Sequence, residues 1–146
     1  MITLRGIQAH YPYRKNEWRM VIPATLLGAA LLFQDGMFET SRSFSALAQT
    51  MPQEAWGVAL LVYAFVRLVA LTVNGSFERF RYSPHMRVFA SVVGMVFWGW
   101  FGWGFLSAAI YAGGALSAVI VYLTIVFPIE IENALNALAD IKPRGA

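Results

Sequence analysis

The chain has 146 residues, of which 58% are hydrophobic and only 13% are charged. Soluble domains are typically about 45–50% hydrophobic and about 25% charged, so the composition excludes a water-soluble monomer and indicates a protein that resides in lipid. The absence of cysteine excludes disulfides, thiolate chemistry and the sulfur ligands of zinc or iron–sulfur sites. The small net charge of +3 is typical of the basic loops that orient a membrane protein, and it does not indicate nucleic-acid binding.

A basic arm, residues 1–19, precedes the first apolar run, which extends from Met20 to Phe33. The run is shorter than the roughly 20 residues that a membrane helix needs, so we predict a first span that borrows from both flanks and covers about residues 19–38. A signal peptide cleaved near Ala46–Ala48 is the rival interpretation. That site lies well beyond the apolar run, which favours a retained span.

A polar loop follows the first span, and the second half of this loop is predicted to form a short helix on the surface. The sequence Thr50-Met51-Pro52-Gln53 then combines a hydroxyl N-cap, an early proline and a capping-box glutamine, so a helix is expected to begin near Met51. This helix is the second predicted span, over about residues 51–74, and its apolar run from Ala55 to Val73 contains one charge, Arg67. The Asn-Gly pair at 74–75 begins a basic loop that extends to Arg87.

The stretch from Val88 to Ile129 contains no charged residue. It is about twice as long as one crossing requires, so two spans are predicted, over about residues 87–103 and 106–128. The turn between them is expected at Gly102–Gly104, with Ser107 capping the last helix and Pro128 ending it. Residues 129–146 are predicted to form an amphipathic segment for the membrane surface or a partner. The predicted fold class is all-α, a single-domain integral membrane bundle of four transmembrane helices with an amphipathic C-terminal segment.

The distribution of lysine and arginine is consistent with four spans. With that count these residues collect on one side of the membrane, except for Arg42 on the other side and Arg67 within a span. Both termini are therefore expected in the cytoplasm. The basic residues beside the spans are expected to contact anionic lipid headgroups, with no nucleic-acid partner. They are Arg14, Lys15, Arg19, Arg79, Arg81 and Arg87.

Arg67 is the one charge within the apolar runs of the predicted spans, and a charged side chain at mid-membrane costs about 2.5–3.5 kcal/mol. One interpretation is that its long stem reaches the cytoplasmic headgroups. Another is that Arg67 faces the bundle interior with Tyr63 and Asn74, which lie on the same helix face. There it would either make a structural hydrogen bond or contribute to a water-lined ion path. The apolar runs of the predicted spans offer no acid as its counter-ion.

Small residues recur at four-residue spacing in the predicted first and last spans, a pattern that lets helix backbones approach closely. They are Ala24 and Gly28 in the first span, and Ala109, Gly113 and Ser117 in the last. Both packing within one chain and packing between copies remain open, and self-association is expected. The aromatic cluster Phe97–Trp103 is interpreted as a belt at the outer membrane interface.

The sequence contains none of the signature motifs of serine hydrolases, zinc proteases or P-loop nucleotide-binding proteins. The acidic residues that follow the first span also lack a histidine on their side of the membrane. We therefore expect no enzymatic activity, no catalytic residue, no cofactor and no metal site.

Between residues 51 and 87 the chain resembles small polytopic membrane proteins encoded by tailed bacteriophages and prophages. The resemblance is carried by Met51–Gly57, Arg67–Leu71, Asn74-Gly75 and Arg81–Arg87. It implies a self-associating phage-type protein of the bacterial inner membrane, holin-like in size, which would permeabilise that membrane. Two alternatives stay open, namely a structural or scaffolding subunit docked on a larger membrane complex, and a small ion or solute carrier that uses Arg67.

Overall fold

The computed structural model describes residues 4–76, 83–139 and 141, and these residues form helices joined by short turns, with no strand among them. The predicted all-α class is confirmed. The helices in chain order are α1 (Leu4–Phe33), α2 (Met37–Thr40), η1 (Arg42–Phe44), α3 (Ser45–Ala48), α4 (Gln53–Ser76), α5 (Ser83–Tyr111), α6 (Leu116–Val121), the π-helical segment η2 (Tyr122–Val126) and α7 (Phe127–Ala139).

In the described part of the chain, three helical segments are long and apolar enough to cross a membrane. They are Gln53–Val73 in α4, His85–Tyr111 in α5, and Leu116–Ala139, which runs through α6, η2 and α7. The predicted membrane character of the chain is confirmed to this extent. The α1 helix is not one of the three, and the predicted first span is the part of the four-span count that this finding leaves open.

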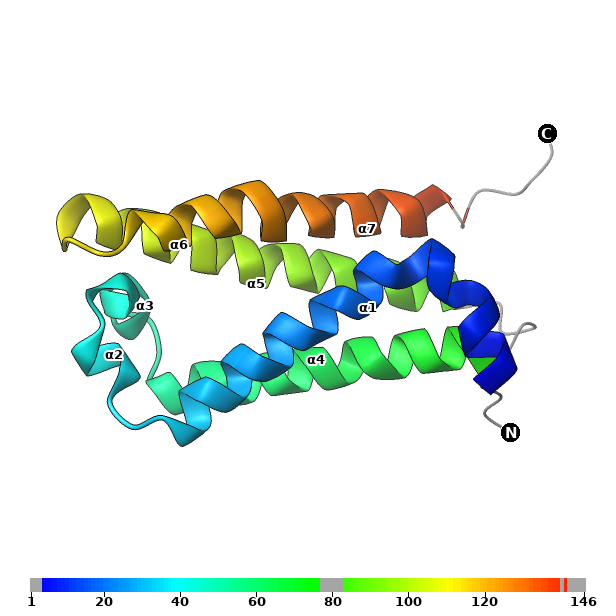
Figure 1. Ribbon diagram of the computed structural model, residues 1–146, viewed down its shortest axis with the longest axis horizontal. Helices are drawn as coiled ribbons and strands as arrows, with labels where there is room; N and C mark the ends of the chain where they lie inside the picture. Colours follow the sequence, from blue (N-terminus) through cyan, green and yellow to red (C-terminus); the bar gives the residue numbers. More distant parts are fainter. Residues whose placement is uncertain (1–3, 77–82, 140, 142–146) are drawn as a thin grey trace.

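The four long helical segments lie side by side, with α1 crossing α4 obliquely (Figure 1). The closest partner of α1 is α4, while α5 packs closely on α7 and less closely on α4. At one end of the bundle lie α2, α3 and the turn between α5 and α6, whereas α1 begins and α7 ends at the other end (Figure 1).

Aromatic side chains fill the half of the bundle next to α2 and α3. Trp98 and Phe101 are buried there, so the interpretation of Phe97–Trp103 as an interfacial belt is wrong for these two residues. Trp100 and Trp103 are 50% and 66% exposed and remain consistent with it. The predicted short surface helix also contributes to this core, whose members include Phe44, Leu47, Trp56, Trp98, Phe101 and Phe105.

The turn predicted at Gly102–Gly104 is wrong, because α5 continues to Tyr111. The reversal occurs at residues 112–115, where Gly113 has a φ of 68° and the N–H of Gly114 donates to the Ala108 carbonyl at 2.9 Å. Glycine at position 104 lets Leu47 pack closely against α5, since a Cβ there would lie 2.7 Å from Cδ2 of Leu47. Ser107 consequently lies inside α5 and does not cap the last helix.

The prediction that the last helix ends at Pro128 is also wrong, because helix continues to the end of α7. Proline has no N–H to donate to the preceding turn, and the π-helical η2 ends two residues before this position, at Val126. The described part of residues 129–146 is therefore not a separate amphipathic segment. It belongs to the last long helix, with Glu130 buried and Leu135 and Leu138 exposed.

Gln53 joins the end of α1 to the start of α4 and does not take part in a capping box. Its Nε2 donates to the Leu31 and Gln34 carbonyls at 2.9 and 2.7 Å. Its Oε1 accepts from the Phe38 N–H at 2.9 Å. The Thr50 hydroxyl, expected as the cap, donates to a carbonyl in its own turn. Gln53 thus satisfies carbonyls that the end of α1 leaves without a helical partner.

Candidate functional site

Arg67 lies in the interior of the bundle and is only 2% exposed. Its Nη1 donates to Oε1 of Glu130 on α7 at 2.5 Å and also to the hydroxyl of Tyr63, one helical turn earlier on α4. The Tyr63 hydroxyl in turn donates to the same Glu130 oxygen at 2.8 Å. The Nε of Arg67 donates to the backbone carbonyl of Glu17 on α1 at 3.1 Å. One guanidinium therefore connects three helices.

A second buried ion pair lies beside the first. The guanidinium of Arg87 on α5 binds the Glu17 carboxylate with two hydrogen bonds, one from Nε to Oε2 at 3.0 Å and one from Nη2 to Oε1. Glu17 thus bonds Arg67 through its backbone and Arg87 through its side chain. We call Glu17, Tyr63, Arg67, Arg87 and Glu130 the ion-pair network, and it contains residues from α1, α4, α5 and α7.

Helical periodicity and one glycine bring these groups together. Tyr63 and Arg67 are four residues apart, and Glu130 and Asn133 are three apart, so each pair lies on one helix face. Asn133 is buried and donates to Oε2 of Glu130 at 3.4 Å. Gly94 on α5 lies against the point where α4 and α7 meet, since a Cβ there would lie 2.5 Å from the Tyr63 hydroxyl and 2.9 Å from the Glu130 carboxyl carbon. A residue without a side chain is required for this approach.

The network balances its own charge, because two arginines face two glutamates. Burying a single charge is prohibitive, whereas a paired and hydrogen-bonded charge is tolerated. Snorkelling of Arg67 to the headgroups is therefore the wrong interpretation, and the interior interpretation is the one consistent with its burial. The expectation that no acid lies within a span is wrong as well, since Glu130 lies within Leu116–Ala139.

The basic residues predicted to contact headgroups lie in different environments. Lys15 and Arg19 are exposed on α1, and Arg14 is half-buried. The prediction that Arg87 contacts headgroups is wrong, because its side chain is buried and paired with Glu17. Arg79 and Arg81 lie outside the described residues, and Asn74 lies on α4 in a part whose side chains the structure does not describe.

The small residues of α1 support packing within one chain. Ala24 is fully buried, and a Cβ on Gly28 would lie 3.0 Å from Cγ of Leu61 and 3.1 Å from the carbonyl oxygen of Gly57 on α4. The second predicted set is not one helix stripe. Its members, Ala109, Gly113 and Ser117, lie on α5, in the turn and on α6, respectively.

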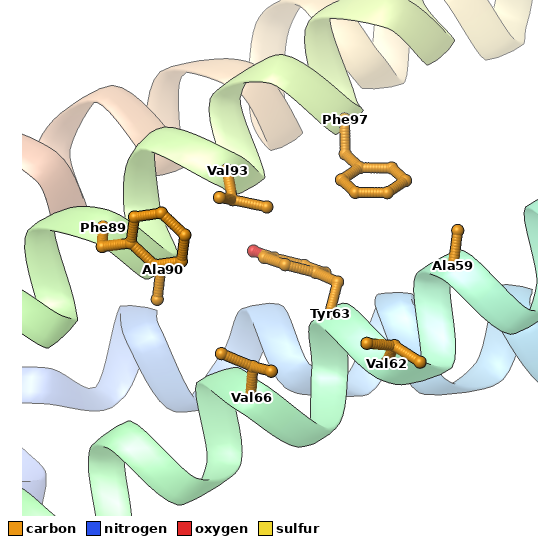
Figure 2. A pocket seen from close by; sticks show the side chains of 8 residues that line it. All are labelled: Ala59, Val62, Tyr63, Val66, Phe89, Ala90, Val93 and Phe97. Atoms are coloured by element: carbon orange, nitrogen blue, oxygen red, sulfur yellow. The ribbon is translucent and has the colours of Figure 1, made fainter.

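A groove of about 270 Å³ separates α4 from α5 on the outside of the bundle. Figure 2 shows the ring of Tyr63 reaching from α4 toward α5 within it, between side chains of both helices. The lining is otherwise apolar, formed by Ala59, Val62, Val66, Phe89, Ala90, Val93 and Phe97. Tyr63 is therefore the residue where this apolar groove and the ion-pair network meet.

Sequence reasoning missed Glu17, Gly94, Glu130 and Asn133. The sequence pattern of α7 could have indicated two of them, Glu130 and Asn133. In α7 the polar Glu130 and Asn133 share a face with small alanines that are buried, while Ile131, Leu135 and Leu138 of the same helix are exposed. Polar or small residues inward and large apolar residues outward are typical of a helix surrounded by lipid.

Within residues 4–76, 83–139 and 141, no cluster of three or more histidine, aspartate or glutamate side chains is arranged to hold a metal ion. The chemistry that the network offers is charge pairing and hydrogen bonding inside an apolar bundle. Comparison with known proteins returns no family model, no curated protein and no solved structure that matches this chain.

Proposed function

We propose that this chain is a non-enzymatic protein of the bacterial inner membrane, built of four transmembrane helices with both termini in the cytoplasm. The fourth span would be α1, which is as long as its neighbours. Its large side chains Ile22, Leu26 and Phe33 are 58%, 65% and 84% exposed, as expected of a lipid-facing helix. Its Glu17 lies inward in an ion pair, so this charge does not oppose insertion.

Cysteine accessibility tests this topology, and the chain has no native cysteine to remove. Lys15→Cys marks the end of the bundle where α1 begins, and Thr50→Cys marks the opposite end. In intact cells a membrane-impermeant maleimide should label Thr50→Cys at once and Lys15→Cys only after the inner membrane is opened. Labelling of both positions in intact cells would contradict the four-span arrangement.

We further propose that the protein acts by self-association in the membrane and permeabilises it, as holins do. The observation that carries this proposal is that the charged groups of the interior are paired within one chain, while large apolar side chains stay exposed on α4, α5 and α6–α7. Contacts between copies would then use apolar faces, which in lipid associate through packing. The resemblance to phage membrane proteins over residues 51–87 supports the same proposal.

Inducible expression in a bacterial host tests permeabilisation. The expected result is potassium efflux followed by entry of a membrane-impermeant dye, together with a ladder of multimers after crosslinking in native membranes. Intact membranes at high expression, with a crosslinked species of monomer size only, would overturn the proposal. Purification with a stoichiometric partner under those conditions would favour the scaffolding alternative.

A second candidate function is a small ion or solute carrier that uses Arg67. The observation that favours it is the burial of Arg67 and Glu130 among four helices, because ionisable residues within membrane helices commonly mark ion or proton paths. Flux into proteoliposomes separates the two candidates. A carrier should lose flux in Arg67→Leu at unchanged protein content and should exclude the dye, whereas a holin-like protein should admit the dye whether or not position 67 is charged.

A further inference from the structure

The hydrogen bonds of Arg67 leave part of its guanidinium open. A guanidinium has five N–H groups, one on Nε and two on each Nη. The Nε donates to the Glu17 carbonyl, and Nη1 donates to Tyr63 and Glu130. Nη2 is buried and has no acceptor among the residues that the structure describes. Both N–H groups of this nitrogen are therefore buried in the bundle without a partner in the described part of the chain.

An open donor on a charged group is costly at this position. Leaving a buried polar group unsatisfied costs about 1–3 kcal/mol, and more when the group is charged. In a bilayer the surrounding hydrocarbon supplies no acceptor, so the acceptor must lie inside the bundle. The indole Nε1 of Trp98 is a second buried donor without a described partner, but it is neutral and costs less.

The charge balance of the network decides which acceptor fits. Arg67 is paired with Glu130, and Arg87 is paired with Glu17, so the network is neutral. An added anion would give it a net negative charge in a medium of low dielectric constant, which is strongly unfavourable. A water molecule accepts hydrogen bonds without changing the charge. It also donates, and Oε2 of Glu130 is a suitable acceptor, because it belongs to the carboxylate that Nη1 binds and its hydrogen bond from Asn133 is long, at 3.4 Å.

We propose that Nη2 of Arg67 binds an internal water molecule, so that the ion-pair network is a hydrated site inside the membrane bundle. This inference goes beyond the proposed function, because it holds for a holin-like protein and for a carrier alike. A bound water beside the Tyr63 hydroxyl and the Glu130 carboxylate would give the network exchangeable protons in the apolar interior.

Solid-state NMR on the full-length protein in lipid vesicles tests the proposal. With arginine labelled with ¹⁵N in its guanidinium, water-edited spectra should show a cross-peak between water protons and Nη2 of Arg67. Arg67→Lys should abolish this cross-peak, and Tyr63→Phe, which keeps the ring and removes only the hydroxyl, should shift it. Trp98→Phe is the matched control, because it removes the other open donor and should leave the cross-peak in place.

Two outcomes would overturn the proposal. One is an Arg67 Nη2 resonance without a water cross-peak in the wild-type protein, a measurement that needs no variant to fold. The other is a resonance that moves when chloride in the buffer is replaced by a bulky organic anion, because the acceptor would then be a halide. If Arg67→Lys does not fold, the shift in Tyr63→Phe still assigns the signal.

Discussion

Replacing Glu130 by methionine tests whether each charge of the ion pair with Arg67 is tolerated in the interior only when the other is present. Methionine has a similar length and carries no charge. The change leaves a guanidinium that is 2% exposed without its carboxylate, and loss of one partner of a buried pair costs about 3–5 kcal/mol. Arg67→Met should destabilise the protein by a similar amount, because it leaves the carboxylate unpaired. The double variant buries neither charge, so we expect it to be less destabilised than either single variant.

The free energy of unfolding of the four proteins is measured in the same mixed micelles by titration with a denaturing detergent, followed by far-UV circular dichroism. Glu132→Met is the matched control, since Glu132 lies on the same helix but is exposed and accepts only a 3.3 Å hydrogen bond from Asn16. Its effect should stay within about 1 kcal/mol of wild type. The reasoning is refuted if the single variants at positions 67 and 130 also stay within that range, or if their effects simply add.

The packing around the network and the placement of the tryptophans give two further predictions. Gly94→Ala should destabilise the protein by about 1–3 kcal/mol, because its Cβ would lie 2.5 Å from the Tyr63 hydroxyl. Gly99→Ala, whose Cβ would lie 3.4 Å from its nearest neighbour, should be close to neutral in the same titration, and equal effects would contradict the close approach at position 94. In single-tryptophan variants reconstituted with brominated lipid, Trp103 fluorescence should be quenched and Trp98 fluorescence protected, because these residues are 66% and 1% exposed. Similar quenching of both would place Trp98 outside the core.

The sequence alone was sufficient for the class of the protein and for most of its helices. With 58% hydrophobic residues and 13% charged residues, a chain of this length has too little polar surface to face water. Long apolar runs then form helices because lipid leaves no other partner for the backbone. The helix of the second predicted span was predicted close to the observed position of α4, and the importance of Arg67 followed from its being a charge within an apolar run. The four-span count and the cytoplasmic placement of both termini stay predictions.

Predictions from single glycine and proline residues were wrong where packing between helices determines the backbone. Glycine is tolerated inside membrane helices, so Gly102 and Gly104 do not mark a turn as they would in a soluble protein. In α5 they lie opposite the side chains of Leu123 and Leu47. Pro128 likewise lies within a continuous helical segment that includes the π-helical turn before it. Neither outcome is encoded in the residues next to these positions.

Only the tertiary structure decided what Arg67 contacts. Its carboxylate partner is 63 residues away in the sequence, on a helix whose acids resembled those of a surface segment. Whether an acid at the edge of an apolar run faces solvent or the interior depends on which helices lie beside it. Here side chains of α4 and α7 meet across Gly94. This close approach pairs Arg67 with Glu130, so that neither charge is buried alone.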